Sequence, residues 1–398
     1  MKYDETSLYN IKTSVTGNRK PLFDLAIWKN GLAFKKIDFS ADGVPVIKIA
    51  ELNNGIGPNT SFSKGDYGDE VRLHRGDLLF SWSGNPQTSI DVYKYPMDDG
   101  WLNQHIFKVT PNETMVSKDF LFYLLKYLKP HFTQIATNKQ TTGLGHVTIA
   151  DLKRMSVVVP AKHIQDRIVS IVKTIDDKIE VNNEINKNLV EQAQALYKDR
   201  FVDLHSFNGE MPPDWHLGEV SEIIELHDSK RIPLSSRERA SLAKIYPYYG
   251  ATSVMDYVDR YLFDGIYLLL GEDGTVVDNN GFPILQYVEG KFWVNNHAHI
   301  ITGKNGFTVE MLYLLFSLTN VQSIITGAVQ PKISQTNLNK MPIVIPSEAE
   351  LSDFNSVIQP IFAQIRNLRA QNDRLVVTRD TLLPRLMSGE LDVSNLDL

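Results

Sequence analysis

Cysteine is absent from all 398 residues of the chain. Disulfide bonds and thiolate metal sites are therefore excluded, and nothing in the composition indicates an oxidising compartment. Apolar runs are short: the longest, around residues 267–270, has the length of a strand, whereas a membrane span needs roughly 18 apolar residues. The first residues also lack the apolar core of a signal peptide. These absences predict a cytoplasmic protein with no membrane segment.

The chain also lacks an excess of positive charge. It has 41 basic and 47 acidic residues, a net charge of −6, and the acidic excess lies after Asp214. Its length, with 42% apolar and 22% charged residues, suits a protein of two or three domains. Because such a chain attracts nucleic acid poorly, DNA binding would need a local basic surface or a basic partner.

Catalytic motifs are missing too. The sequence has no Walker loop, no Rossmann fingerprint and no Asn/Asp-Pro-Pro-aromatic methyltransferase motif. The nearest approach, Asn85-Pro86-Gln87, lacks both the second proline and the aromatic residue.

The sequence repeats itself once. Three blocks return in the same order at a nearly constant offset, which indicates an internal duplication. The matching blocks are residues 101–106 and 293–298, residues 121–125 and 311–315, and residues 147–160 and 333–346.

A long helical pattern follows each copy. Apolar residues recur every seven positions in two rows, from Ile168 and Val172 in the first copy and from Leu351 and Phe354 in the second. This spacing predicts two long helices that form an antiparallel coiled coil, the first over residues 163–201 and roughly 55 to 60 Å long. A helix pair inside an ordinary bundle is the alternative.

Polar residues and a proline interrupt these rows. Asn182, Asn186 and Asn372 fall within the seams, where lone asparagines commonly fix helix register. Pro360 is expected to kink the second helix or to delay its start. Gly389 is expected to end it.

The remaining sequence predicts an α+β fold with two similar mixed α/β domains, separated by the long helices and related by a pseudo-twofold repeat. Strands are expected at residues 44–49, 77–81, 265–270 and 292–301. The expected boundaries are an N-terminal extension at 1–20, a first domain at 21–160, a helix at 161–204, a linker at 205–214, a second domain at 215–346, a helix at 347–390 and a tail at 391–398.

Two groups of residues imitate metal sites. Asp278 with the Glu289-Gly290-Lys291 segment resembles the acidic residues of Mg²⁺ nucleases, but it has no counterpart in the first copy and suits a hairpin with turns. His297 and His299 would share one strand face. Only His297 has a counterpart, His105, so a structural, hydrogen-bonded role is favoured for that pair. We therefore predict no catalytic residue and no metal ligand.

In combination, these features resemble the specificity subunits of type I restriction-modification systems, over nearly the whole chain. The resemblance rests on the Trp-x-Asn-x-His segments at 101–105 and 293–297, the loops at 143–152 and 327–338 before Val/Ile-Pro, and the ending at 382–391. It implies that each domain is a target-recognition domain for one half of a split DNA sequence. It also implies that the helices set the gap and dock two methyltransferase subunits.

The resemblance further implies that double-stranded DNA is the ligand and that restriction subunits join the full complex. S-adenosylmethionine, ATP and Mg²⁺ would belong to those partners, so this chain would need no cofactor. The copies differ in the segments between the repeated blocks, for example residues 42–77 against residues 229–261, which predicts an asymmetric target.

Polar, turn-rich segments with basic residues are the candidate DNA contacts. In the first copy these are Lys48, Arg72, Arg75, Ser83, Asn85, Lys139 and Gln140; in the second they are Lys230, Arg231, Arg237, Arg239, Lys244, Gln330 and Lys332. Two alternatives stay open. A stand-alone metal nuclease would cleave DNA in Mg²⁺ without partners, and an architectural coiled-coil protein would show no sequence preference.

Overall fold

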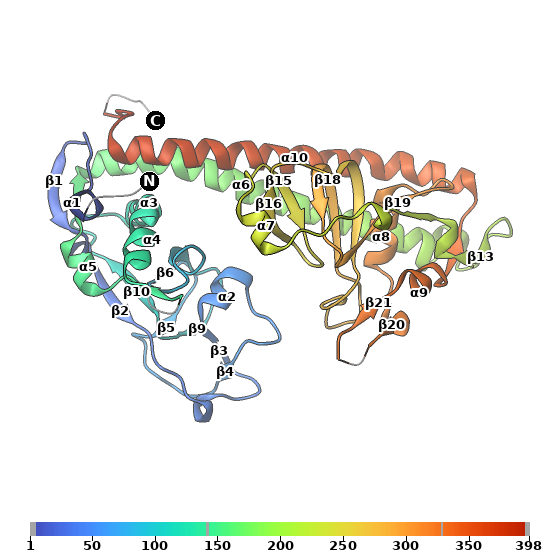
Figure 1. Cartoon of the computed structure of the whole chain (residues 1–398), viewed down its shortest axis with the longest axis horizontal. Coiled ribbons are helices and arrows are strands. Elements are labelled where there is room, and N and C mark those ends of the chain that lie inside the picture. The colour runs from blue at the N-terminus through green and yellow to red at the C-terminus, as the bar shows by residue number, and fades with distance from the viewer. Residues whose placement is uncertain (1–4, 141–142, 328, 395–398) are drawn as a thin grey trace. The chain divides into compact units, whose positions relative to one another are not determined.

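The computed structural model describes residues 5–140, 143–327 and 329–394 (Figure 1). The chain divides into two compact units. Unit 1 comprises Met1–Ile179 and Arg374–Leu398, and unit 2 comprises Glu180–Asp373. Helices α6 (Lys162–Tyr197) and α10 (Glu348–Ser388) each contribute one part to either unit. In the described part of the chain, no helix is long and apolar enough to span a bilayer.

Two four-stranded sheets form the body of unit 1. The first is antiparallel throughout, whereas the second contains one parallel pair, β3 with β9. Their strand orders are β2 (Ala26–Asn30), β10 (Ile106–Pro111), β6 (Leu78–Ser81), β8 (Asp91–Lys94); and β4 (Phe62–Ser63), β3 (Val44–Ile47), β9 (Gly100–Leu102), β5 (Arg72–Leu73).

Helices cover the first of these sheets. α3 contacts β8 and β10, and it buries Phe120, Leu121 and Leu124, which the helical period places on one face. The Ser117 side chain caps this helix by accepting a hydrogen bond from the Phe120 amide. The other elements of unit 1 are α1 (Glu5–Tyr9), α2 (Ile49–Asn54), α3 (Lys118–Tyr127), α4 (Lys129–Asn138), α5 (Ile149–Arg154), β1 (Gly17–Pro21) paired with β12 (Ser156–Pro160), and β7 (Ser83–Gly84) paired with β11 (Gly145–His146).

The segment before β1 packs against the end of α10. Leu8 and Ile11 are buried in the same core as Leu386. The Ser14 amide donates to the Ser388 carbonyl at 2.7 Å. The core of unit 1 is therefore completed by residues far apart in sequence.

Unit 2 is built on a six-stranded sheet. All neighbours are antiparallel except β15 and β18, and α8 packs on β17, β18 and β19. The strand order is β14 (Ile224–Leu226), β19 (Ala298–Gly303), β17 (Phe263–Gly271), β18 (Leu285–Val294), β15 (Tyr246–Tyr249), β16 (Val254–Val258). The remaining elements are α7 (Ser236–Ala240), α8 (Val309–Ser317), α9 (Gln335–Asn339), β13 (His216–Glu219) paired with β22 (Pro342–Ile345), and β20 (Ile325–Thr326) paired with β21 (Lys332–Ile333).

The internal duplication is visible in the strands that carry the repeated tryptophans. Trp101 on β9 aligns with Val46 of a parallel neighbour, and Trp293 on β18 aligns with Tyr248 of a parallel neighbour. A short turn then leads into the next strand in both units. The same local topology therefore occurs twice.

This turn corrects one strand prediction. The strand expected at 292–301 is interrupted, because β18 ends at Val294 and β19 begins at Ala298. The Asn295 side chain accepts from the His297 amide at 2.8 Å, which stabilises a turn. The strand expected at 44–49 also ends early, at Ile47, because Lys48 begins the cap of α2.

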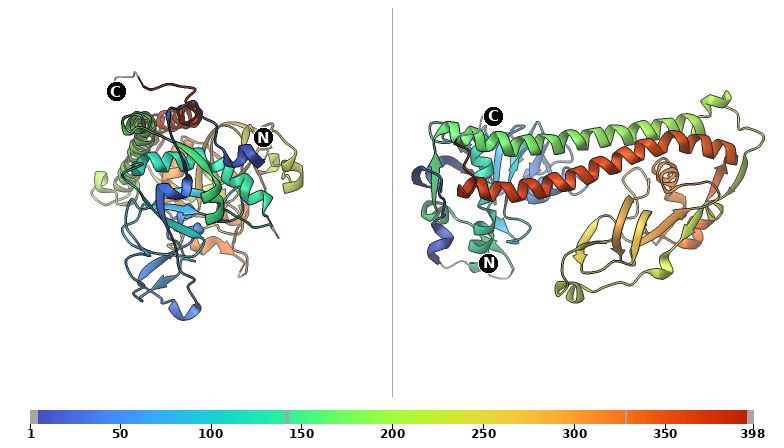
Figure 2. Two further views of the ribbon diagram at one scale, coloured as in Figure 1. Left: turned by 90° about the vertical axis from the view of Figure 1, so that its left-hand side faces the viewer. Right: turned by 90° about the horizontal axis from the view of Figure 1, so that it is seen from above.

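Helices α6 and α10 are antiparallel (Figure 2). In unit 1, Asp176 pairs with Arg379 at 3.0 Å. In unit 2, Asn182 contacts Asn372, and Arg200 pairs with Asp353. Residue numbers on α10 fall as those on α6 rise. Most residues of the predicted seams are buried, as at Ile168, Val172, Ile358 and Ile365. Leu196 is an exception: it is 42% exposed, whereas its neighbours Ala193 and Tyr197 are buried. This difference arises because a strict seven-residue row drifts around a straight helix.

The prediction that Pro360 delays the second helix is wrong. α10 begins at Glu348 and continues past Pro360 to Ser388. A proline removes one backbone hydrogen bond from a helix. Here Ile358 and Phe362, on either side, are buried in the core of unit 2, and this packing maintains the helix.

Candidate nucleic-acid interface

The β20–β21 hairpin of unit 2 lies on the side of this unit away from α10 (Figure 1). Gln330 and Val329 are exposed at its tip, Val329 at 98%. The Lys332 ammonium lies 3.1 Å from the Glu272 carboxylate, and its side chain remains 48% exposed. The hairpin thus presents an amide, an apolar and a basic side chain to solvent.

A buried polar network supports this hairpin. His299 is fully buried, with Nδ1 2.6 Å from Asp228 Oδ2 and Nε2 2.8 Å from the Ile333 carbonyl. Asp228 also accepts from the Ile300 amide and the Gln335 side chain. Burial disfavours the charged form of Asp228, but the hydrogen bonds from these groups outweigh burial and hold its pKa below the usual value.

Arg231 joins the same network. Its guanidinium pairs with Glu272 at 2.5 Å and donates to the Ala298 carbonyl at 2.8 Å. Burial raises the pKa of Glu272, but hydrogen bonds from Arg231 and Lys332 and the charge of His299 lower it more. Two of the predicted DNA contacts, Arg231 and Lys332, are therefore held by one carboxylate.

The network also resembles a metal site in composition. Asp228, Glu272 and His299 offer ligand atoms within 4.8 Å of one another. Both His299 nitrogens already have partners, and both carboxylates contact Arg231 or Lys332. We interpret the group as a hydrogen-bonded ion network.

The two histidines that suggested a shared strand face do not share one. His297 lies in the turn after β18, where its Nδ1 hydrogen-bonds Asp273, whereas His299 lies on β19. His105 differs from its counterpart: its φ is 77°, and its buried Nδ1 has no partner among the described residues. Burial and the nearby His146 lower the pKa of His105.

The residues that imitate a nuclease site have separate partners. Asp278 accepts from the amides of Asn280 and Phe282, and so shapes a turn. Glu289 lies 4.0 Å from Arg366, and the Lys291 ammonium lies 4.7 Å from the centre of the Tyr261 ring.

The other basic residues of unit 2 fall into two groups. Arg239, which is largely buried, and Lys244 both pair with Asp256. The hydrogen bond from Lys244 is the main cause that lowers the pKa of Asp256 to about 2. Lys230 and Arg237 are exposed and have no ion pair within the described residues.

Most basic candidates of unit 1 also have acidic partners. Arg72 forms a bidentate pair with Asp99, and its guanidinium lies 4.4 Å from the centre of the Trp101 ring. Arg75 pairs with Asp98 at 2.7 Å. The Lys48 ammonium contacts the Ser61 hydroxyl at 3.0 Å.

Lys139 has a clear structural contact. Its ammonium lies 2.5 and 2.6 Å from the two carboxylate oxygens of Asp151, which is buried and caps α5. Hydrogen bonds from Lys139, Thr148 and Tyr9 outweigh burial and hold the pKa of Asp151 below the usual value. Gln140 is exposed.

Several side chains of the polar loop at residues 81–85 are already hydrogen-bonded within the protein. Ser83 is buried, and its hydroxyl contacts Nδ1 of His146 at 2.8 Å. Asn85 is exposed, but its side-chain oxygen accepts from the Gln87 and Thr88 amides. Trp82 is half-buried, and its indole N–H donates to Asn30.

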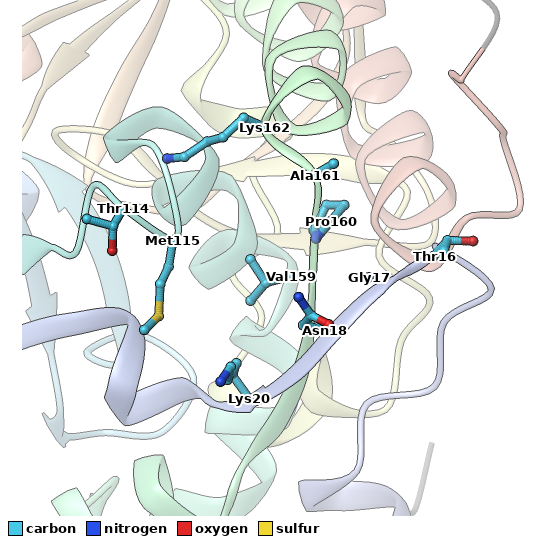
Figure 3. Close-up of a pocket in the computed structure, with 10 residues that line it drawn as sticks. All are labelled: Thr16, Gly17, Asn18, Lys20, Thr114, Met115, Val159, Pro160, Ala161 and Lys162. Atoms are coloured by element: carbon cyan, nitrogen blue, oxygen red, sulfur yellow. The ribbon is translucent and has the colours of Figure 1, made fainter.

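A pocket of about 400 Å³ lies in unit 1 where β1, β12 and the start of α6 meet (Figure 3). Met115, Val159 and Pro160 supply apolar walls, and Lys20 and Lys162 lie at its edge. None of the predicted DNA contacts lines it.

Comparison with known proteins decides the family. The type I restriction modification DNA specificity domain matches residues 18–191 and 212–373, which is most of the chain and includes both copies of the repeat. The chain belongs to this family.

Individual relatives agree with this assignment. A specificity subunit of the type I restriction enzyme MjaIX, from Methanocaldococcus jannaschii, is 24% identical over 81% of this chain and 79% of its own length. The specificity subunit of the type I restriction enzyme HindI, from Haemophilus influenzae, is 22% identical over 80% of this chain and 87% of its own length. A third, S.HindORF215P from the same bacterium, is 30% identical, but the chain spans only 36% of its length.

Among solved structures, the S subunit of a type I restriction-modification system from M. genitalium aligns with 97% of this chain and 98% of its own, with a TM-score of 0.49 and 15% identity. The family match and the curated relatives show that the chain is a type I restriction-modification specificity subunit. Such subunits contribute DNA recognition and not catalysis.

Sequence reasoning missed the acidic partners and the network around His299. Asp228, Glu272, His299 and Ile333 come from four separate segments. No local pattern could have brought them together.

Proposed function

We propose that this specificity subunit recognises an asymmetric DNA target in two parts, with unit 1 contacting one half-site and unit 2 the other. The support is the duplication: the two units share the turn after a repeated tryptophan, yet differ in their polar loops. The proposed recognition domains are residues 21–160 and 215–346, with the spacer helices at 161–204 and 347–390.

The proposed contacts differ in how freely their side chains can meet DNA. Gln140, Lys230, Arg237 and Gln330 are exposed without a salt bridge among the described residues, and are the first candidates. Arg72, Arg231 and Arg239 are fixed by carboxylates, which orients each guanidinium before DNA arrives. Exposed basic side chains would supply phosphate contacts, and contacts to base edges would supply sequence discrimination.

The spacer helices are proposed to dock two methyltransferase subunits, and restriction subunits in the full complex. Both helices keep apolar side chains exposed: Val181 and Ile185 on α6 in unit 2 are 45% and 38% exposed, and Val377 on α10 in unit 1 is 66% exposed. These side chains are available to contact a docked subunit. S-adenosylmethionine, ATP and Mg²⁺ would act in the partners.

The test is reconstitution. The purified chain alone should neither bind S-adenosylmethionine nor methylate or cut DNA, and added methyltransferase subunits should restore methylation at one split sequence. Mg²⁺-dependent cleavage by the chain alone, abolished by Asp278→Ala, would support the nuclease alternative. An assembled complex without sequence preference would support the architectural one.

A further inference from the structure

The buried His299 faces two groups that can only accept hydrogen bonds. Its Nδ1 lies 2.6 Å from the Asp228 carboxylate and its Nε2 lies 2.8 Å from the Ile333 carbonyl. A neutral imidazole has one N–H, whereas the imidazolium has two. Only the doubly protonated form satisfies both contacts.

The second acceptor belongs to the hairpin. Ile333 lies on β21, directly after Lys332, and its amide donates to the Glu272 carbonyl at 2.9 Å. His299 therefore binds the Ile333 carbonyl, and the Glu272 carbonyl binds the Ile333 amide. The hairpin that carries Gln330 and Lys332 leaves the sheet from this point.

We infer that His299, as an imidazolium, is a positioning residue for half-site recognition by unit 2: it fixes the β20–β21 hairpin in the position from which Gln330 and Lys332 contact DNA. This inference rests on the proposed function. If His299 lost one proton, the lone pair of that nitrogen would face the Ile333 carbonyl or the Asp228 carboxylate. Two buried acceptors that face each other without a hydrogen bond destabilise the structure.

The charges around His299 agree with this role. Asp228 faces it from the 3-10 turn Asp228–Lys230, and Arg231 follows that turn. Glu272 lies 3.8 Å away after β17, and Lys332 contacts Glu272 from β21. Two carboxylates meet two permanent cations, so the cluster carries a net positive charge only when His299 is protonated. A net positive cluster beneath the hairpin favours an approaching phosphate.

The experiment uses the full chain assembled with its methyltransferase partners. Duplexes altered in one half-site at a time are titrated from about pH 6 to 9, the range in which histidines change charge. Affinity for the unit 2 half-site should fall as the pH rises, beyond any change at the unit 1 half-site. His299→Gln should lower it about tenfold at low pH, because this change removes a hydrogen bond to a charged group, and should flatten the pH profile.

His297→Gln is the matched control, since this side chain lies two positions away, is 44% exposed and, within the described part of the chain, pairs with Asp273 alone. It should leave both half-sites unchanged. Asp228→Asn is a second test: it removes the charge that stabilises the imidazolium, so the decline in affinity should begin at lower pH.

Nitrogen NMR of ¹⁵N-histidine-labelled chain reports the protonation state directly. Two protonated ring nitrogens of His299 at neutral pH are expected, and a neutral ring would overturn the inference, as would equal pH profiles for both half-sites. A wild-type complex without specificity for either half-site would contradict the proposed function instead, and the NMR result would still decide the state of His299.

Discussion

At the scale of residues, Gln330 and Lys332 are the proposed DNA contacts on the β20–β21 hairpin of unit 2. Changing both to alanine should weaken binding to one half-site only, by about 1 to 3 kcal/mol for each base that the hairpin no longer recognises. The measurement is a titration with duplexes randomised in one half-site at a time. Equally weakened binding to both half-sites and to unrelated DNA would show that the hairpin contacts only phosphates.

Gln140 and Lys139 should behave differently from each other. Gln140→Ala should weaken the other half-site without changing stability, because its side chain is exposed. Lys139→Ala removes a partner of the buried Asp151 carboxylate, so it should also lower the free energy of unfolding by about 1 to 3 kcal/mol. Urea unfolding separates the two effects, and an unchanged unfolding curve for Lys139→Ala would mean that the ion pair has no structural role.

His131 should make unit 1 sensitive to acid. Burial lowers the pKa of this histidine, although the Leu8 carbonyl opposes the shift. Below about pH 6.5 the unfolded chain takes up a proton that the folded chain resists, so stability falls as the pH drops toward the lower folded value.

Melting curves measured at neutral and mildly acidic pH test this. His131→Gln should reduce the acid-induced loss of stability relative to wild type. His74→Gln, a substitution at an exposed histidine, should leave that loss unchanged. If His131→Gln lost as much stability in acid as the wild type, the acid sensitivity would belong to the buried carboxylates instead.

At the scale of elements, the asparagine contacts between α6 and α10 should specify the register of the helix pair. Asn182 Nδ2 donates to Asn372 Oδ1 at 2.8 Å and to Gln371, and Asn372 donates to Asn183. The buried side-chain oxygens of Asn182 and Asn186 have no hydrogen-bond partner among the described residues.

Asn182→Leu alone should destabilise the chain, since it removes the hydrogen bonds that Asn182 donates to Asn372 and Gln371 across the buried seam. The double change Asn182→Leu with Asn372→Leu should recover stability in urea unfolding, because an apolar pair suits the seam, at the cost of a less uniform register. A double variant no more stable than the single one would contradict this.

The helices should also set the length of the gap in the target. One heptad inserted into both helices adds about 10 Å, which corresponds to about three base pairs of DNA. Mapping of methylated sites in cells carrying the variant should show the same half-sites at a longer spacing. Altered bases at an unaltered gap would refute the role of the helices as spacers.

The helices were predictable because their seven-residue rows are a local, repeated pattern. The turn at 295–297 was predictable in principle, since Asn-Asn favours turns, but the apolar residues around it favoured one continuous strand. The ion pairs of Arg72, Arg231 and Lys139 were not predictable, because each acidic partner lies in another segment of the chain. The sequence could therefore predict which loops carry the candidate DNA contacts, but not which side chains in those loops lack an acidic partner.

At the scale of the whole molecule, the net charge of −6 opposes binding to DNA. The chain alone should bind DNA weakly, with a shallow dependence of affinity on salt. With its partners the dependence should become steep, as more phosphates are neutralised. Fluorescence anisotropy at several salt concentrations measures the salt dependence of DNA affinity for the chain alone and for the complex. A steep dependence for the chain alone would show that its own basic residues neutralise enough phosphates to bind DNA.

The division of the chain has a consequence for the order of folding during synthesis. Unit 2 is one continuous stretch, Glu180–Asp373, whereas unit 1 needs Arg374–Leu398 as well as its N-terminal part. The core around Leu8 and Ile11 lacks Leu386 and Met387 until these two residues have left the ribosome. Domains usually fold from the N-terminus onward during synthesis. Here unit 2 can fold first, and unit 1 must wait for the segment that begins at Arg374.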